Sequence, residues 1–425
     1  MAFFGHFKKD AGGFTQDSSG GKPKNRWAAP LVYLLTVAGS ILFLAVGNKI
    51  ASQGLGYLTK QGDGEPVRAQ VLKVYSRTSD AYDIGGDTTL QQVEIQFSAK
   101  LLSGDRRGEE VLAVQSNDSF AQLEEVEPGD KVLLYYMPGS QVPWMMGEYV
   151  RTDGLLLLGA LFLAALLLFG RSKGINTIVS LVFTCLAVFL VLIPSVLSGQ
   201  NIYWSSIIVC AFVIVMTLLI VSGFHRKTLA ACCGCFGGVL LCGFLTVAMD
   251  GVLRLTGMVD EHSLYLATLN PENPINLKAV IFASIIIGAM GAIMDVAISL
   301  ASSLWELYEQ AAQPTPKMLI RSGFAIGRDM MGTMSNTLIL AYIGSSMSVV
   351  LLLLAYNNSA QALLNREMIV VEILQALVGS LGILCTIPLT SVLCAVVYPH
   401  RRKKRLHGEN MLDLDHAFDE DSVLK

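Results

Sequence analysis

The sequence predicts an all-α polytopic membrane bundle of about eight transmembrane helices that carries a small extracytoplasmic β domain. Of its 425 residues, 52% are hydrophobic and only 15% are charged, and the mean hydropathy is +0.52. Soluble globular proteins rarely have this composition. Eight apolar runs are each long enough for a helix to cross about 30 Å of hydrocarbon, and one polar block, residues 61–150, separates the first run from the others.

The chain begins with a polar segment, residues 1–26, that is rich in Gly, Ser and Lys. Because it lacks apolar periodicity, we expect this segment to be a disordered cytoplasmic leader. Trp27 then opens an uncharged run, residues 27–47, that is long enough to span a bilayer. A basic leader also precedes cleaved signal peptides, but their apolar core is usually about 7–15 residues long. The sequence therefore favours a retained transmembrane anchor.

The polar block, residues 61–150, has the pattern of a β domain. Short alternating or β-branched segments at 67–75, 91–99, 109–115 and 131–137 are separated by turn signals that contain Gly and Asp. Short strands with close turns predict a small β-barrel, for which an OB-like topology is one option.

The charge of this block limits its partners. It contains 15 Asp and Glu residues against 7 Lys and Arg residues, which disfavours nucleic acid as a ligand. Gating, substrate handling and contact with a protein partner are open roles for it, and so is a plain external cap without a ligand.

Seven further apolar runs form the predicted membrane domain, residues 154–398. In chain order they cover residues 154–170, 175–197, 202–221, 229–253, 279–305, 332–356 and 368–397. With the anchor they give about eight spans, an even number, so both termini are expected on one side of the membrane.

Basic residues in the loops predict which side that is. The loops that a cytoplasmic N-terminus would place inside carry Arg171, Lys173, Arg226, Lys227, Lys317, Arg321, Arg328 and the tail run 401–405, and the opposite loops carry only the single bases Arg151, Arg254, Lys278 and Arg366. The positive-inside rule therefore predicts a multi-pass protein of the cell membrane, with N- and C-termini cytoplasmic and the β domain outside. The tail, residues 399–425, is expected in the cytoplasm, where its basic run can contact anionic lipid of the bilayer.

The sequence lacks the common motifs of enzymes and ATP-driven pumps. It contains no phosphate-binding loop that ends in Gly-Lys-Ser/Thr, no His-Glu-x-x-His and no Gly-x-Ser-x-Gly. Its histidines all lie in termini, loops or helix ends, so they do not suggest a haem or a buried metal site. We therefore expect no enzymatic activity and no cofactor.

A cysteine cluster, Cys232-Cys233-Gly234-Cys235, has the Cys-x-x-Cys spacing of a metal or redox site. It lies among Ala and Gly residues at the end of a predicted span, where small polarizable side chains commonly pack between helices. Helix packing is therefore the favoured interpretation. None of the eight cysteines falls in the polar block, so no disulfide framework is indicated.

One carboxylate, Asp295, stands in the middle of the run 279–305. A charged side chain at this depth costs at least about 2.5–3.5 kcal/mol on insertion scales, and it usually faces a bundle interior, a partner or a water path. Ser299 follows four residues later and Glu306 eleven residues later, so on a helix they share a face with Asp295. The pattern predicts a polar stripe from mid-membrane to the cytoplasmic edge.

The next run begins with a second set of polar residues: Arg328, Asp329, Asn336 and Thr337. In an antiparallel hairpin its first turns come level with Asp295, so Arg328 or Asn336 could pair with that carboxylate. A carboxylate that moves between shielded and hydrated surroundings binds and releases a proton. This second set is therefore expected to gate the site.

The sequence also allows a structural role for these residues. Asp295 would then be permanently paired and would hold two helices together, with Arg328 and Asp329 as an interfacial ion pair. Three further carboxylates near outer helix ends are secondary candidates: Asp250, Glu367 and Glu372.

Two segments carry a resemblance to a known family. GAIMDVAISLASSLWEL (291–307) and GRDMMGTMSNTLILAYIGSSM (327–347) resemble the signature of the YibE/F-like multi-pass membrane proteins. The similarity extends to the single anchor, the small β domain and the seven-span body. It implies this architecture and does not by itself imply an activity.

A second, local resemblance covers only about fifty residues. The order Gly-x-x-x-Asp, Glu, Gly-Phe and Thr-Leu-Ile is similar to the proton-carrying hairpin of SecD/SecF and related RND-type permeases, and here it comprises Gly291, Asp295, Glu306, Gly323-Phe324 and Thr337-Leu338-Ile339. Those exporters have a far larger external domain and a different span count, and the segment 328–332 has no counterpart in them. The resemblance implies a proton-coupled mechanism.

The polar residues and the resemblances predict an ion- or proton-coupled secondary transporter or exporter. Asp295 is the expected coupling carboxylate, and the transported species is an unknown solute or protons. The alternative is a non-transporting membrane assembly or signalling factor whose β domain binds a protein partner.

Overall fold

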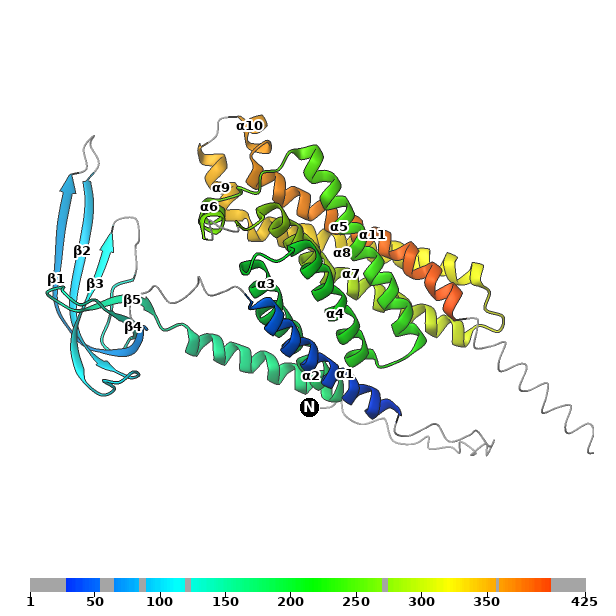
Figure 1. Ribbon diagram of the computed structural model, residues 1–425, viewed down its shortest axis with the longest axis horizontal. Coiled ribbons are helices and arrows are strands. Elements are labelled where there is room, and N and C mark those ends of the chain that lie inside the picture. Colours follow the sequence, from blue (N-terminus) through cyan, green and yellow to red (C-terminus); the bar gives the residue numbers. More distant parts are fainter. Residues whose placement is uncertain are drawn as a thin grey trace, which may run out of the picture. The chain divides into compact units, whose positions relative to one another are not determined.

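The computed structural model describes residues 28–53, 65–83, 89–118, 124–269, 274–356 and 359–398. These residues are mostly helical and include one group of strands (Figure 1). They divide into two units, Ser52–Val182 with Leu197–Gly199 in one and the rest of the chain in the other. The predicted leader and the predicted tail both lie outside the described residues.

The strands form a closed five-stranded barrel in the first unit. They are β1 (Val67–Asp83), β2 (Thr89–Leu101), β3 (Glu110–Asp118), β4 (Lys131–Tyr136) and β5 (Trp144–Tyr149). The order around the barrel is β1-β2-β3-β5-β4, with β3 and β5 parallel and the other pairs antiparallel. A five-stranded barrel with this order is an OB-fold, so the predicted small β domain is confirmed.

Alternating burial along the strands explains why the barrel closes. Val71, Ile95, Phe97 and Leu134 point inward and are almost fully buried, because alternate residues of a strand face the same side. β1 pairs with both β2 and β4. Two register shifts, after Val71 and after Val74, bend the strand so that it can reach both neighbours.

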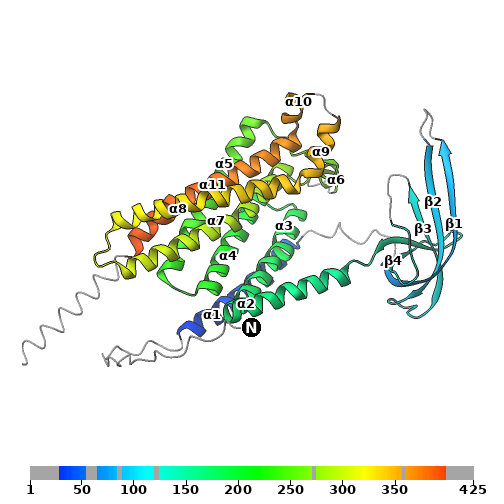
Figure 2. The same cartoon turned by 180° about the vertical axis from the view of Figure 1, so that it is seen from behind.

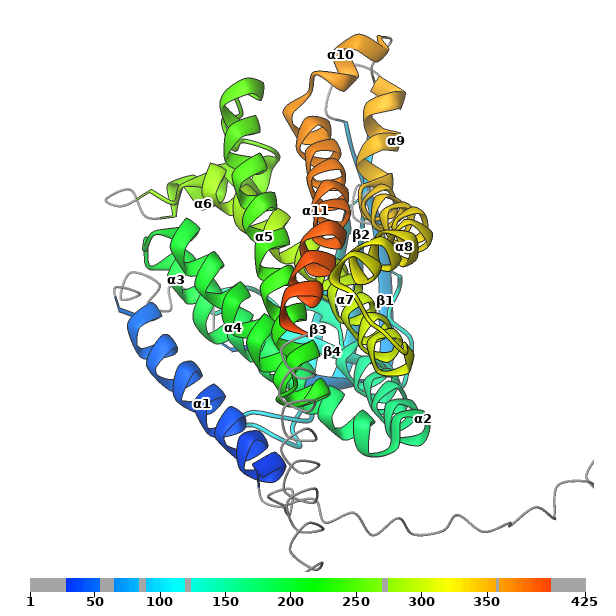
Figure 3. The ribbon, with the colours of Figure 1, turned by 90° about the vertical axis from the view of Figure 1, so that its right-hand side faces the viewer.

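The second unit is a helical bundle around α7. The helices of the chain are α1 (Ala28–Ala51), α2 (Thr152–Ala187), which continues through a π-helical turn (Val188–Leu192) into α3 (Ile193–Leu197), then α4 (Ile202–Ser222), α5 (Arg226–Leu253), α6 (Glu261–Thr268), α7 (Leu277–Gln310), α8 (Pro316–Ser345), α9 (Met347–Tyr356), α10 (Ala360–Leu364) and α11 (Glu367–Val397). Within the bundle, α7 contacts α4, α5, α8 and α11 (Figures 2 and 3).

Seven helices in the described part of the chain are long and apolar enough to cross a membrane. They are Pro30–Ala51, Thr152–Arg171, Lys173–Leu197, Ile202–Ser222, Arg226–Leu253, Leu277–Gln310 and Glu367–Val397. The chain is therefore a multi-pass membrane protein, as its composition predicts.

The predicted apolar run 332–356 differs from the observed helices. α8 ends at Ser345 and α9 begins at Met347, so the run is divided between two helices. The first half of α8 precedes the run and carries charged residues, which lower its hydropathy, and α8 is consequently absent from the seven candidate spans.

α8 nevertheless runs antiparallel to α7 and α11 along the bundle. Near its start, Gly323 packs against Leu304 of α7, and near its end Tyr342 lies against Gly288 of α7 and Gln375 of α11. Its 30 residues correspond to about 45 Å of α-helix. α8 is therefore as long as a membrane span.

Glycines allow α5 and α11 to pack closely. A Cβ atom at Gly238 would overlap the hydroxyl of Thr386, and one at Gly382 would overlap Sγ of Cys242. Gly234, inside the Cys-x-x-Cys segment, packs in the same way against α11. The small residues of α5 therefore bring the two backbones together, as small residues do in membrane bundles.

We expect Gly238→Val to destabilise the bundle by about 1–3 kcal/mol, because the added side chain overpacks the α5–α11 contact. Thermal unfolding of the detergent-purified protein measures this loss. Gly251→Val is the matched control, since Gly251 lies on the same helix with no atom within 4 Å of a Cβ at this position. Equal melting temperatures for the two variants would contradict the packing described above.

Candidate functional site

One face of α7 contains the residues that the sequence singles out. The apolar side chains on the other faces are buried, and Ile285, Ile286, Ile293 and Leu300 are fully inaccessible. The small and polar residues that are exposed or half-buried along the remaining side are here called the α7 stripe: Ser284, Gly288, Gly291, Asp295, Ser299, Ser302 and Glu306. The half-buried apolar side chains of Ile287, Met294 and Ile298 flank them. The spacing of three or four residues within the stripe places its members on one narrow side of the helix.

Asp295 lies in the middle of the α7 stripe and is exposed within the chain. Among the described residues it has no hydrogen-bond or ion-pair partner. Ser299 and Glu306 share its face, and Ser303 Oγ donates to the Ser299 carbonyl at 3.0 Å. The carboxylate must therefore find its partner in water, in a cation or in another protein segment.

The four polar residues that are expected to gate the site also lie on exposed parts of a helix. Arg328, Asp329, Asn336 and Thr337 are all exposed on α8, and the Thr337 hydroxyl donates to the Thr333 carbonyl at 2.8 Å. The opposite face of α8 packs against α7 and α11. α8 is thus apolar toward the bundle, and on its exposed side these polar residues lie among the exposed apolar side chains Phe324, Leu340 and Ile343.

The antiparallel packing determines which residues of α7 and α8 lie at the same depth. Because Leu304 lies beside Gly323 and Gly288 beside Tyr342, Asp295 is about level with residues 332–335. Arg328 lies about one turn nearer the connecting loop. In the part of the chain that the structure describes, Arg328 forms no ion pair with Asp295, and Asn336 is the closer of the two expected partners in depth.

A polar cluster that the sequence does not assign to the site lies over Gly288, in the first half of α7. A Cβ atom at Gly288 would be 2.5 Å from the Tyr342 hydroxyl oxygen and 3.5 Å from Gln375 Nε2, so both groups lie over this glycine. Glu372, which precedes Gln375 by three residues on α11, is near enough to Tyr342 to interact electrostatically. Glu372 is one of the secondary candidates from the sequence, and its three-residue spacing from Gln375 in an apolar run is the signal that could have identified Gln375.

Two of the secondary carboxylates have fixed structural partners. Lys278 Nζ lies 3.3 Å from Asp250. The Glu367 carboxylate accepts hydrogen bonds from the backbone N–H groups of Thr256 at 2.8 Å and Gly257 at 2.6 Å, and from the Thr256 hydroxyl at 2.7 Å. These bonds attach the segment after α5 to the first turn of α11, where the helix dipole also favours a carboxylate.

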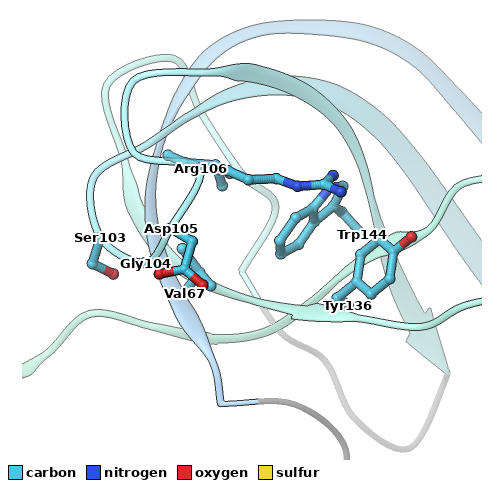
Figure 4. Close-up of a pocket in the computed structure, with 8 residues that line it drawn as sticks. Val67, Ser103, Gly104, Asp105, Arg106, Tyr136 and Trp144 are labelled. Carbon is cyan, nitrogen blue, oxygen red and sulfur yellow. The ribbon is translucent and has the colours of Figure 1, made fainter.

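A second candidate site is a pocket in the barrel, shown in Figure 4. It has a volume of about 210 Å³ and is lined by Val67, Leu101, Ser103, Gly104, Asp105, Arg106, Tyr136 and Trp144. The Arg106 guanidinium lies 5.7 Å from the centroid of the Tyr136 ring, which meets Trp144 edge-on at 5.1 Å. Aromatic surface beside a few charged groups is a common composition of ligand pockets.

Comparison with known proteins identifies the membrane domain. Residues 158–400 match the family model described as YibE/F-like protein. The match covers more than half of the chain and includes all of α7, α8 and α11. No curated protein and no solved structure was found to match the chain.

We expect Glu367→Ala to lower the stability of the purified protein by about 2–3 kcal/mol, because two backbone donors lose a charged acceptor. Thermal unfolding in detergent measures the effect. Glu309→Ala is the control, since Glu309 is exposed near the end of α7 and has no partner among the described residues. If both variants melt like the parent protein, the structural role of Glu367 is wrong.

Proposed function

The chain belongs to the YibE/F-like protein family, and for this member we propose a function as an ion- or proton-coupled secondary transporter or exporter. One observation carries the proposal: the α7 stripe runs along a helix whose opposite face is apolar and buried. At membrane depth, a polar face of this kind usually lines a water path or contacts protein.

Asp295 is the coupling carboxylate in this proposal. A carboxylate without a permanent partner can exchange a proton or bind a cation, whereas one held by several donors stays charged. Glu367 accepts three hydrogen bonds, but Asp295 accepts none from the described residues. This difference makes Asp295 available for coupling.

The α7 stripe and the cluster over Gly288 supply the two halves of a route. Glu306 and Ser299 lead from the α7–α8 loop to Asp295, and they form the cytoplasmic access path. Tyr342 and Gln375 continue the polar surface toward the other end of α7. Polar groups in such a row can hold bridging waters along which a proton moves.

The polar face of α8 gates this route. Arg328 lies about one turn from the depth of Asp295, so a shift or rotation of α8 brings its guanidinium to the carboxylate. An approaching Arg favours the charged form of the carboxylate and so releases its proton. Asp329, Asn336 and Thr337 provide alternative hydrogen-bond partners on the same face.

In this proposal α8 is the eighth membrane crossing. Since α8 packs antiparallel to both α7 and α11 over the length of a membrane span, the three helices cross together. An even number of crossings places both termini on one side, and the basic loops assign that side to the cytoplasm. The barrel is then outside the cell membrane.

The barrel pocket supports a second candidate function, a non-transporting assembly or signalling factor. Tyr136 is 41% exposed and lies beside Arg106 and Trp144, and aromatic and Arg side chains are enriched where proteins bind partners. If the protein is such a factor, the double substitution Tyr136→Ala/Arg106→Ala abolishes binding of the protein partner, and substitutions at Asp295 leave this binding unchanged.

Replacing Asp295 by Asn tests the transport function. Asn keeps size and polarity but cannot titrate, so we expect at least a tenfold loss of gradient-driven flux in proteoliposomes at normal yield and stability, and partial flux for Asp295→Glu. Probes are pH-sensitive and Na⁺-sensitive dyes under an imposed gradient.

A structural role for Asp295 gives a different pattern. Arg328→Gln and the double variant Asp295→Asn/Arg328→Gln test whether Asp295 and Arg328 form a structural ion pair. If Asp295→Asn lowers yield and the double variant restores it, Asp295 holds the helices together. Full flux for Asp295→Asn contradicts the coupling role.

The crossing of α8 is tested by labelling single cysteines with a membrane-impermeant maleimide in intact cells. With the native cysteines replaced by Ser, we expect Gln361→Cys, after α8, to react from outside and Gln313→Cys, before α8, to react only after the cells are opened. Labelling of both positions from the same side would contradict eight crossings.

A further inference from the structure

We propose that two copies of this chain pack the outward faces of α7 and α8 against each other about a two-fold axis parallel to the membrane normal. The inference rests on the proposed function for the membrane crossing of α8 and for the role of the enclosed route. It adds that this route is complete only at an interface between two copies.

Glycines give the first argument for a missing helix partner. Gly323 and Gly327 face the bundle, where a Cβ atom would overlap Ser391 or Ile387 of α11. Gly291, Gly332 and Gly344 belong to the same two helices, yet no atom of the described chain lies within 4 Å of a Cβ built on any of them. Small residues of this kind allow helices in membranes to approach closely. The outward glycines offer a second helix the same close approach that the inward glycines give α11.

The apolar span Thr152–Arg171 of the same chain does not suit this face. Its residues from Leu155 to Phe169 include no polar side chain. Such a helix can offer neither a hydrogen bond nor a counter-ion to Asp295. Lipid tails do not suit this face either, since hydrocarbon gives a charged side chain neither a hydrogen bond nor a counter-ion.

A second copy supplies charges of the right sign at the right depth. Because Leu304 of α7 lies beside Gly323 of α8, Glu306 is about level with Arg321, and Ser299 with Arg328. Rotation about an axis along the membrane normal leaves every residue at the same depth in both copies. Glu306 of each copy therefore lies at the depth of Arg321 in the other. A two-fold interface forms both of these pairs at once.

The same packing completes the coupling site. Arg328 lies on the exposed face of α8 about one turn from the level of Asp295, within reach of a long side chain. Across the interface, Arg328 of one copy can therefore reach Asp295 of the other. Arg328 of each copy is then a gating partner for Asp295 of the other copy as well as for its own.

Charge exchange between two differently tagged chains tests the interface. The Glu306→Arg variant has Arg at both 306 and 321, and the Arg321→Glu variant has Glu at both. Position 306 of one copy faces position 321 of the other, so a mixed dimer forms two Arg–Glu pairs. A dimer of either variant alone places like charges opposite each other at both pairs. We expect co-expressed variants, extracted with native lipid in polymer discs, to give mixed pairs several-fold more often than same-variant pairs. Equal frequencies would overturn the proposal, because an ion pair within one chain predicts no preference.

A matched charge exchange in the barrel is the control. Glu148 and Arg151 form an exposed ion pair at 2.8 Å, and Glu148→Arg co-expressed with Arg151→Glu should show no preference for mixed complexes. A preference equal to that of the α7–α8 variants would overturn the assignment of the interface to α7 and α8.

Cross-linking provides a second measurement that needs no charge change. With the exposed cysteines 185, 233 and 385 replaced by Ser, Gly332→Cys should form dimers with a short bis-maleimide in native membranes, whereas Leu377→Cys, which is 54% exposed on α11, should not. Dimers at Leu377 and none at Gly332 would overturn the proposal. A monomer that still loses flux on Asp295→Asn would overturn the dimer and leave the transport function standing.

Discussion

Hydrocarbon gives no hydrogen bond to a polar side chain, and this constraint determines how α7 must be surrounded. A helix face that meets lipid has its apolar residues outward, and α11 has exposed apolar side chains of this kind at Leu377 and Val396, which are 54% and 60% exposed. α7 has the reverse arrangement, since most of its Ile and Leu residues are buried, and Ser284, Gly291, Asp295, Ser299 and Glu306 are exposed. The outward face of α7 is consequently suited to water or protein and not to lipid.

The bundle holds this face in a defined orientation. α5 and α11 contact α7 from the inner side, and the close packing of α5 on α11 depends on glycines at positions 238 and 382. Because packed interiors deform little, α7 is not free to rotate its polar residues away from the uncovered side. α8 has only its inner face against the bundle, so it is the element that can move relative to Asp295.

Much of the fold could be predicted from local sequence patterns, and the remainder depends on contacts between distant segments. Run length identifies the spans, alternation identifies the barrel, and the spacing of Asp295, Ser299 and Glu306 predicts their common face. The end of α8 was missed because the apolar run continues across Ser346. The cluster of Tyr342 and Gln375 joins helices far apart in the sequence, and the depth of Arg328 depends on how the α7–α8 hairpin packs, so neither follows from periodicity.

The carboxylates of this chain differ in the partners around them more than in their position along helices. Glu367 lies at a helix start with three donors, Asp250 faces Lys278, and Asp295 has no partner in the described chain. A carboxylate with fixed donors gains stability from remaining charged, and any loss of that charge costs the fold free energy. Only a carboxylate without fixed donors can change its charge or its ligand while the bundle stays folded. In the proposed transport function, the missing donors together with the position in an apolar run therefore separate Asp295 from Asp250 and Glu367 as the residue that couples a gradient to movement of α8.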